Sequence, residues 1–475
     1  GASIISARMG GGNKGTAKSG TSMASPHVAG VAALLRQAHP AATPGVLKSL
    51  LMNSGVAMKD RNGGVYAVSK QGAGRVQAYE AALSPLVFDP PSISFGVVPA
   101  NEVAEGTRRV KVTNIGGEPV RASVAWKTSE GLTLSAPPTL DVPAGGSVDL
   151  TISFAVDLRR ANVVETEVEG KALLTVPRAS GPALELVVPA LAVATRGSEI
   201  AISEAAPLAE GPVSLALTNR GPIEGDALAF NLLARDEIGT GRSGACDLSS
   251  AGYRVVRRTV GSTTKDYLQF GFNLASPMST WHFCELSVLV DEDGDGVAEQ
   301  ELAGTFDGDL KAPAALCSGP FASFLIDAPK MRAIRARIEQ GQARPTEYPQ
   351  AVLDAQPFVR FPHSTVAYLS ADLSKVKRTA SGNIRVKVGV LPASAGAVVD
   401  DFLGLEGGAW FEIDPRALPY TEMNERVSAA ASASSRLDFK SAGLDRGLVV
   451  YLPHNSATAG RSVLVRPNGQ ALVIR

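Results

Sequence analysis

Residues 19–30 read SGTSMASPHVAG, and a long run of small and apolar residues continues from them. From Ser22 to about Ala38 this composition predicts a helix that is buried on nearly every face. Pro26 is compatible with such a helix because it falls within the first turn or so. Ser22 therefore lies at a helix start, where unpaired backbone N–H groups and the helix dipole favour negative charge. A serine in this place is either an ordinary N-cap or a nucleophile with oxyanion donors nearby.

The longer string SGTSMASPHVAGVAALL resembles the serine motif of the subtilisin-like serine peptidases, the subtilases, almost letter for letter. The preceding GASIISA resembles the strand before that motif, and GAGRVQAYEAA resembles the closing segment of the family. The resemblance covers residues 1–84 and implies the C-terminal part of an α/β domain. It implies that Ser22 is the nucleophile of a serine endopeptidase, with its backbone N–H as one oxyanion donor. It also makes His27, in the same helix, a structural residue and not the base.

The chain departs from the family upstream of Ser22, because the family order is Asp, then His, then Ser. No DTG-like or HGT-like segment precedes Ser22, and His39, His282, His363 and His454 have no HGT-like context. The family's oxyanion asparagine, which also lies upstream, has no counterpart here. We therefore expect a fragment that is inactive without the missing N-terminal part of the same peptidase domain, since a lone nucleophile keeps only residual catalysis.

Residues 1–84 contain further local signals. A second helix is predicted with Thr43 as its N-cap and Pro44 as its first residue, and it ends before Gly55. Residues 10–20, GGGNKGTAKSG, predict a flexible loop because turn-forming residues dominate. The helices would pack against a parallel sheet that is mostly missing, so we expect their apolar faces to lack partners.

Alternating apolar and polar segments dominate after a proline-rich boundary near residue 84. Residues 85–195 predict an antiparallel β-sandwich, and they resemble the fibronectin type III-like domains that follow many secreted subtilases. In residues 196–475, VSLALTNRGPIEGDALAF echoes the earlier VKVTNIGGEPVRASVAW, which predicts a further β-rich region of one or two domains. The expected fold is multidomain: a C-terminal remnant of an α/β subtilisin-like domain followed by antiparallel β-sandwich modules.

An acidic loop, VDEDGDGVAEQE, occupies residues 290–301 between two apparent strands. Alternate carboxylates on a tight loop converge on a hard cation, and the pattern resembles the first half of an EF-hand loop. Position twelve is Leu302 instead of glutamate, so Glu299 or Glu301 has to close the site. We expect a structural calcium site at 291–301, with an acidic turn that binds nothing as the alternative. The predicted ligands are Asp291, Asp293, Asp295, Val297 through its carbonyl, and Glu301.

Composition limits the partners of the chain. The 46 basic and 46 acidic residues give a formal net charge of zero, so nucleic acid is not a favoured partner. Residues 1–84 carry nine basic residues against two acidic ones, which indicates either a solvated basic surface or a missing acidic partner. No apolar run is long enough to predict a membrane span. Cys246, Cys284 and Cys317 form no CxxC pair, which argues against zinc; they fit one disulfide with a free thiol, or three reduced thiols.

Two functional interpretations follow from these observations. In the first, the chain is part of a secreted, extracellular subtilase that acts on protein or peptide substrates. In the second, it is a non-enzymatic, secreted β-sandwich protein for binding or adhesion that carries a peptidase relic. Upstream Asp and His motifs in the full-length chain would favour the first.

Overall fold

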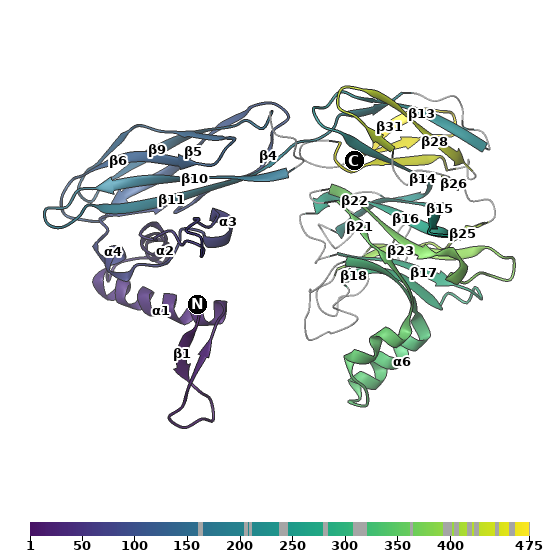
Figure 1. Cartoon of the computed structure of the whole chain (residues 1–475), viewed down its shortest axis with the longest axis horizontal. Coiled ribbons are helices and arrows are strands. Elements are labelled where there is room, and N and C mark those ends of the chain that lie inside the picture. The colour runs from purple at the N-terminus through teal and green to yellow at the C-terminus, as the bar shows by residue number, and fades with distance from the viewer. Residues whose placement is uncertain are drawn as a thin grey trace. The chain divides into compact units, whose positions relative to one another are not determined.

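The computed structural model describes residues 1–159, 165–203, 208, 211–236, 246–278, 284–306, 321–361, 364–392, 401–402, 408–415, 420–421, 427–441, 446–455 and 461–474. The chain forms two compact units, Gly1–Thr195 and Arg196–Arg475 (Figure 1). Strand residues outnumber helical residues in both units, and most of the described α-helices lie at the start of the first unit.

The first unit begins with four helices and a small hairpin, and long strands follow them. Its helices are α1 (Thr21–Ala38), α2 (Pro44–Asn53), α3 (Val68–Gln71) and α4 (Ala78–Leu83). Its strands are β1 (Ile4–Ala7), β2 (Gly15–Lys18), β3 (Leu86–Asp89), β4 (Ile93–Pro99), β5 (Ala104–Asn114), β6 (Val120–Thr128), β7 (Leu132–Ser135), β8 (Thr139–Val142), β9 (Ser147–Val156), β10 (Glu165–Val176) and β11 (Leu184–Thr195).

Local signals in residues 1–84 located both long helices. Helix α1 covers the predicted segment, and α2 begins at Pro44 with Thr43 as its N-cap, whose side chain accepts from the Val46 N–H. The flexible loop predicted for residues 10–20 is wrong in its second half, because β2 pairs with β1 there in an antiparallel hairpin. The turn closes because Gly10 and Gly12 have φ values of 67° and 59°, which glycine adopts at little cost.

Two sheets form the body of the first unit. The five-stranded sheet has the order β4-β11-β10-β6-β8, and the four-stranded sheet has the order β3-β5-β9-β7. Every pair in them is antiparallel except β4 with β11, which is parallel. Alternate residues from both sheets are buried in one hydrophobic core, as expected when the two layers face each other.

The second unit is built around one continuous ten-stranded sheet. Its helical segments are α6 (Ala328–Glu339) and the 3₁₀ helices η4 (Pro345–Ala351) and η5 (Leu373–Lys375). Its strands are β12 (Ile200–Ile202), β13 (Gly211–Asn219), β14 (Gly225–Arg235), β15 (Leu248–Val260), β16 (Thr263–Met278), β17 (Cys284–Asp291), β18 (Gln300–Phe306), β19 (Phe321–Asp327), β20 (Val352–Pro357), β21 (Val359–Arg360), β22 (Ser364–Asp372), β23 (Ile384–Pro392), β24 (Asp401–Phe402), β25 (Phe411–Ile413), β26 (Tyr420–Thr421), β27 (Val427–Ala429), β28 (Ser434–Ser441), β29 (Leu448–Leu452), β30 (Arg461–Val465) and β31 (Ala471–Ile474).

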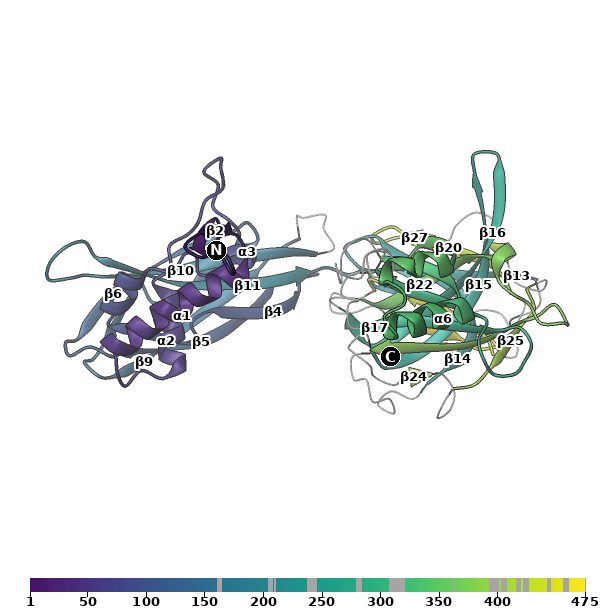
Figure 2. The ribbon, with the colours of Figure 1, turned by 90° about the horizontal axis from the view of Figure 1, so that it is seen from below.

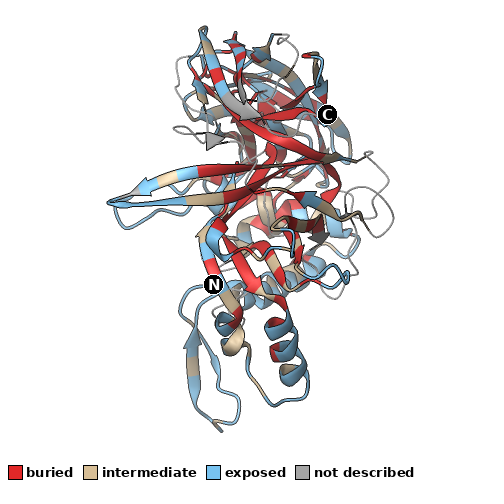
Figure 3. Cartoon of the chain, turned by 90° about the vertical axis from the view of Figure 1, so that its right-hand side faces the viewer, coloured by how far each residue is buried: buried red, intermediate tan, exposed pale blue. Residues whose placement is uncertain are grey.

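The ten-stranded sheet, with β22, β16, β15, β14 and β29 at its centre, shares one core with the seven-stranded sheet and another with the three-stranded sheet. Because one sheet supplies residues to both cores, the region is a single compact unit. The hairpin of β15 and β16 projects beyond the rest of this unit (Figure 2). Buried residues follow the central strands, whereas the segment near the N-terminus of the chain is mostly exposed (Figure 3).

A buried arginine ties three of these strands together. Arg254 on β15 is only 1% exposed. Its Nε donates to Gln269 on β16 at 2.8 Å, and its Nη1 donates to the Ala229 carbonyl oxygen on β14 at 3.3 Å. The guanidinium carbon lies 4.2 Å from the centre of the Phe230 ring. Burial lowers the pKa of Arg254 to about 9, so the group stays charged at neutral pH and the ring face offsets part of that charge.

The weak internal similarity seen in the sequence has a counterpart in the structure. Asn114 ends β5 and Asn219 ends β13, and both are buried. Each accepts a hydrogen bond from the backbone N–H two residues later, at 2.9 Å in both units. Each also donates to the carbonyl four residues later and to one distant strand, at Val142 and Ala429 respectively. The repeated Thr-Asn-x-Gly signal therefore marks the same strand-ending turn twice.

Candidate functional site

Ser22 is exposed and is the second residue of α1. Gly20 precedes the helix as its N-cap with a φ of 150°, a conformation that favours glycine. Its carbonyl oxygen accepts from the N–H groups of Met23 and Ala24 at 3.1 and 3.3 Å. The N–H of Ser22 lies in the same first turn, where the helix itself provides no acceptor. The position thus combines an exposed hydroxyl, a backbone donor and the positive end of a helix dipole.

Both histidines of the first unit are engaged elsewhere. The Nδ1 of His27 lies 2.9 Å from the Met23 carbonyl oxygen, and the Nε2 of His39 lies 3.0 Å from the Ala82 carbonyl oxygen. His282 and His363 lie outside the described residues. In the second unit, the ring of His454 packs edge-on against Phe361, and burial lowers its pKa. Among the described residues of the first unit, no histidine is therefore placed to serve Ser22 as a base.

The surface around the serine helix is apolar and uncovered. The expectation that α1 is buried on nearly every face is wrong for this chain, because Leu35 is its buried residue while Val28 and Leu34 are 42% and 59% exposed. The expectation that the apolar faces of this segment lack partners is confirmed for α1 by the same two residues. Only one side of α1 packs, against α2 and α4. Most of the exposed large hydrophobic residues of the described chain lie in this segment: Ile5, Met9, Val28, Leu34, Val56, Met58, Val65, Tyr66, Tyr79 and Leu83. A soluble domain rarely leaves such a surface open, so it is suited to contact further protein.

The acidic loop joins two antiparallel strands, β17 and β18, as the sequence predicted. Asp291, Asp293 and Glu299 each offer a carboxylate oxygen, and these three atoms lie within 4.8 Å of one another. Asp291 is buried, and its two oxygens accept from the N–H groups of Gly294 and Gly296 at 2.6 and 3.0 Å. Carboxylate oxygens accept more than one contact, so these bonds leave lone pairs for a cation.

The structure groups the predicted ligands differently at the end of the loop. Asp295 accepts from the Val297 N–H at 2.6 Å and lies outside the group of three. Glu301 lies on β18, where its carboxylate accepts from the Ser287 hydroxyl at 2.7 Å. Glu299 joins the group instead, because its N–H bonds to the Val290 carbonyl oxygen at 2.9 Å and closes the loop beside Asp291. The sequence offered both glutamates, and the hairpin register selects Glu299.

The positively charged side chain of Arg385 already lies beside this loop. The Nε of Arg385 on β23 lies 3.3 Å from an oxygen of Asp291. Arg385 therefore offsets part of the negative charge, and a bound metal ion would share Asp291 with it.

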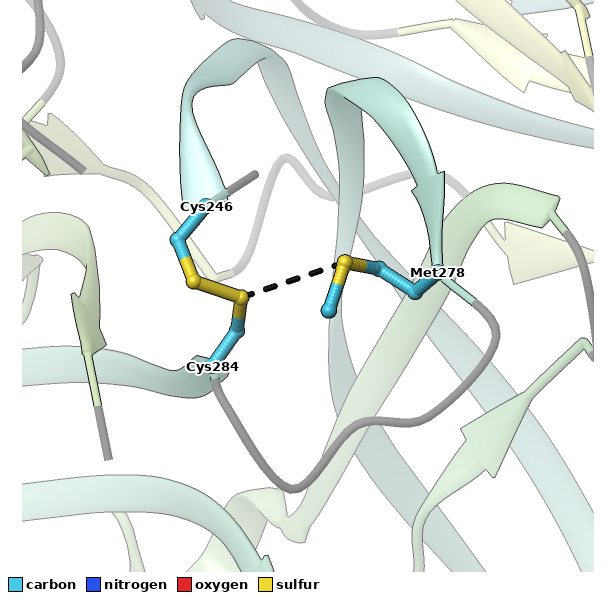
Figure 4. The surroundings of a disulfide bond; sticks show 3 residues. All are labelled: Cys246, Met278 and Cys284. Atoms are coloured by element: carbon cyan, nitrogen blue, oxygen red, sulfur yellow. Dashed lines mark hydrogen bonds between the residues drawn. A yellow bond between two sulfur atoms is a disulfide. The ribbon is translucent and has the colours of Figure 1, made fainter. Parts of the chain in front are cut away.

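The cysteines pair across the larger core of the second unit. Cys246 and Cys284 form a disulfide, which lies beside Met278 with its sulfur 3.9 Å from that of Cys284 (Figure 4). Both cysteines are buried, and Cys317 lies outside the described residues. Of the two alternatives left by the sequence, the structure contains the disulfide. Among the described residues, no helix is both long and apolar enough to cross a membrane.

Solved structures with a similar arrangement cover parts of the chain. The MSP-domain protein SSP-19 of Caenorhabditis elegans is 16% identical, with a TM-score of 0.17, over 22% of this chain and 96% of that one. The YadV chaperone is 11% identical, with a TM-score of 0.18, over 40% of this chain and 92% of that one. Likenesses at these scores support no conclusion about the fold or the function of this chain.

Sequence relatives match the start of the chain. The model of the Subtilase family matches residues 4–74. The minor extracellular protease Vpr of Bacillus subtilis is 31% identical over 146 residues, 30% of this chain and 18% of that protein. The subtilisin-like protease SBT1.2 of Arabidopsis thaliana is 42% identical over 83 residues, 16% of this chain and 10% of that protein. The matches thus span less than a fifth of either relative. Residues 4–74, which include Ser22, are therefore similar to a segment of the subtilase family.

Proposed function

We propose that the chain is the C-terminal part of a serine endopeptidase of the subtilase type. It hydrolyses peptide bonds in protein or peptide substrates through an acyl-enzyme on Ser22. The base and its orienting acid are a His and an Asp from an upstream part of the same peptidase domain. The observation that carries this proposal is the place of Ser22, exposed at the start of α1 within the segment that matches the subtilase family.

Each step of the reaction assigns a role to a group at this site. The upstream His takes the proton of the Ser22 hydroxyl as its oxygen attacks the scissile carbonyl carbon. The negative charge that develops on the carbonyl oxygen is stabilised by the Ser22 N–H and by the helix start. The leaving amine takes the proton from the His, and water then releases the acyl group from Ser22.

The uncovered apolar surface of α1 supports the proposal that a further protein segment packs against it. Val28 and Leu34 of α1 are large apolar residues with open faces, and burying a side chain of this kind contributes about 1.5–3 kcal/mol. An upstream peptidase segment would cover this surface and bring the base to Ser22 in the same event.

Labelling with a fluorophosphonate tests the proposal directly. The 475-residue chain alone is expected to stay unlabelled, because no histidine among the described residues of the first unit is placed to act as a base for Ser22. The chain extended upstream by a subtilase segment with Asp and His is expected to carry one label on Ser22, mapped by peptide mass spectrometry. Ser25→Ala, which changes an exposed serine of the same helix, is the control and should leave the label in place. A folded, extended chain that stays unlabelled would instead favour the non-enzymatic binding or adhesion protein with a peptidase relic.

We further propose that the protein is secreted and that residues 85–195 are a fibronectin type III-like module. The buried disulfide of Cys246 with Cys284 supports an oxidising compartment. The printed name of the Bacillus relative describes an extracellular protease. Two facing sheets with one core support the module assignment.

For the acidic loop we propose a structural calcium site. Asp291 and Asp293 from one side of the loop and Glu299 from the other offer three oxygens within 4.8 Å. Oxygen donors of this kind suit calcium, and three clustered carboxylates repel one another unless a cation balances them. Arg385 supplies part of that balance at Asp291, so calcium would add to it at Asp293 and Glu299.

Calcium is expected to raise the melting temperature of the second unit, because a ligand that binds only the folded state stabilises it. At a hundred times the Kd the gain is about 2.7 kcal/mol. Asp293→Asn is expected to remove the rise and leave the melting temperature in EDTA nearly unchanged, because Asp293 is exposed. Asp295→Asn, in the same loop but outside the group of three, is the matched control. Differential scanning calorimetry with calcium and with EDTA measures both, and equal melting temperatures in the wild type would rule the site out.

A further inference from the structure

The helices of residues 1–84 share a very small core. Its buried members are Leu35 of α1, Leu50 of α2, Ala81 of α4 and Val87 of β3. Val87 belongs to the following β region, so the segment itself contributes three of the four. Ordering a residue costs about 1–2 kcal/mol of backbone entropy, which a core of this size does not offset for 84 residues. The fold of this segment therefore depends on contacts outside it.

Asn53, at the end of α2, makes the most extensive of these contacts. It is 1% exposed. Its Nδ2 donates to the carbonyl oxygens of Pro91 at 2.8 Å and Val187 at 2.7 Å, on two separate stretches of the β region. Its Oδ1 accepts from the Ser49 hydroxyl at 2.8 Å, and the Ser49 oxygen in turn accepts from the Phe88 N–H at 2.7 Å. Two side chains of α2 thus bond to three backbone groups of the β region.

A second contact lies at α3. Glu167 and Glu169 alternate on β10, so they share one side of the strand. The Glu169 carboxylate accepts from the Val68 N–H at the start of α3, and Glu167 accepts from the Ser69 hydroxyl at 2.6 Å. Carboxylates at a helix start stabilise it. They also place two carboxylates beside a segment that carries nine basic and two acidic residues.

We infer that residues 85–195 are the scaffold on which the serine-bearing segment folds. We call Asn53 the latch, because its side-chain hydrogen bonds hold the two parts together. Figure 1 shows α2, α3 and α4 along the strands of this region. The partner of the β region is thus the peptidase segment of its own chain. The contacts described above support the scaffold role. Its importance for peptide hydrolysis rests on the function proposed above. In that setting the latch holds α2, against which α1, the helix that carries Ser22, packs.

Hydrogen exchange of the whole 475-residue chain, followed by mass spectrometry, tests the latch. Asn53→Ala removes both donors, and Asn53→Asp keeps the shape but places a carboxylate oxygen against two carbonyl oxygens. Both variants are expected to raise exchange in Thr21–Asn53 at least tenfold, with Asn53→Asp at least as severe as Asn53→Ala. Peptides of β5 and β9 are expected to stay within twofold of wild type. Asn13→Asp, at an exposed asparagine of the same segment, is the matched control.

Asn53→Asp tests whether the hydrogen bonds donated by Asn53 matter, or only its shape. If only the shape mattered, the exchange of this variant would equal that of wild type. That result would overturn the latch, and so would unchanged exchange in both variants. Equal loss of protection in β5 and β9 would overturn the scaffold, since the two parts would then unfold as one. None of these outcomes depends on peptidase activity, so an unlabelled Ser22 in the extended chain would remove the proposed function and leave the scaffold intact.

Discussion

Ser22→Ala, made in the chain extended upstream to carry the Asp and His, is expected to lower kcat by a factor on the order of 10⁶. That factor corresponds to about 8 kcal/mol of transition-state stabilisation. Alanine removes the oxygen that forms the acyl bond but keeps the backbone N–H at the helix start. The residual rate should therefore stay about 10³–10⁴ above that in water, from binding and the oxyanion donors. Steady-state hydrolysis of a chromogenic peptide substrate measures both numbers.

Two comparisons keep this result interpretable. Ser25→Ala changes a neighbouring exposed serine in the same helix, and its kcat should stay within a few fold of the parent. The KM of Ser22→Ala should change little, because the hydroxyl is not needed for ground-state binding. A Ser22→Ala enzyme that kept a tenth or more of the parent kcat would show that another group is the nucleophile.

Removing the disulfide is expected to cost the second unit about 4 kcal/mol of unfolding free energy. Cys246 and Cys284 are 38 residues apart in sequence, and cross-linking a loop of that length lowers the entropy of the unfolded chain by about that amount. The double variant Cys246→Ala and Cys284→Ala tests this without burying new hydroxyls, since both sites are buried. The midpoint and slope of urea unfolding give the change in unfolding free energy. Calorimetry serves as a second probe of the same change.

The wild-type protein with its disulfide reduced provides the control for this measurement. Wild-type protein unfolded with a reducing agent should match the double variant. A double variant within 1 kcal/mol of the oxidised wild type would show that the bridge contributes little.

Signals confined to a few neighbouring residues were sufficient for much of this protein. Helix α2 was located from Thr43 and Pro44, since a cap and a first-turn proline act on backbone groups within one turn. The acidic hairpin was located from alternate aspartates and glycines between two apolar runs. Ser22 was singled out by a motif of contiguous residues, to which the family match adds.

Other features depend on residues that are far apart in the chain, and only the tertiary structure decided them. Glu299 instead of Glu301 joins Asp291 because the pairing of β17 with β18 sets which glutamate faces the loop. The bridge of Cys246 with Cys284 depends on how the strands that carry them pack in the larger core. The exposure of α1 depends on which surfaces are present to cover it, so an apolar sequence alone predicted burial that this chain does not provide.

The contact between the serine segment and the β region is the clearest case of this division. Asn53 looks like an ordinary polar residue at a helix end, and the sequence carries no sign that the carbonyls of Pro91 and Val187 meet it. The amino-acid sequence by itself determined the local elements, the candidate nucleophile and the acidic loop, because their physics is settled within a few residues. Which side chains satisfy which distant backbone groups was decided by the packed fold, because a buried hydrogen bond forms only where folding brings its two partners together.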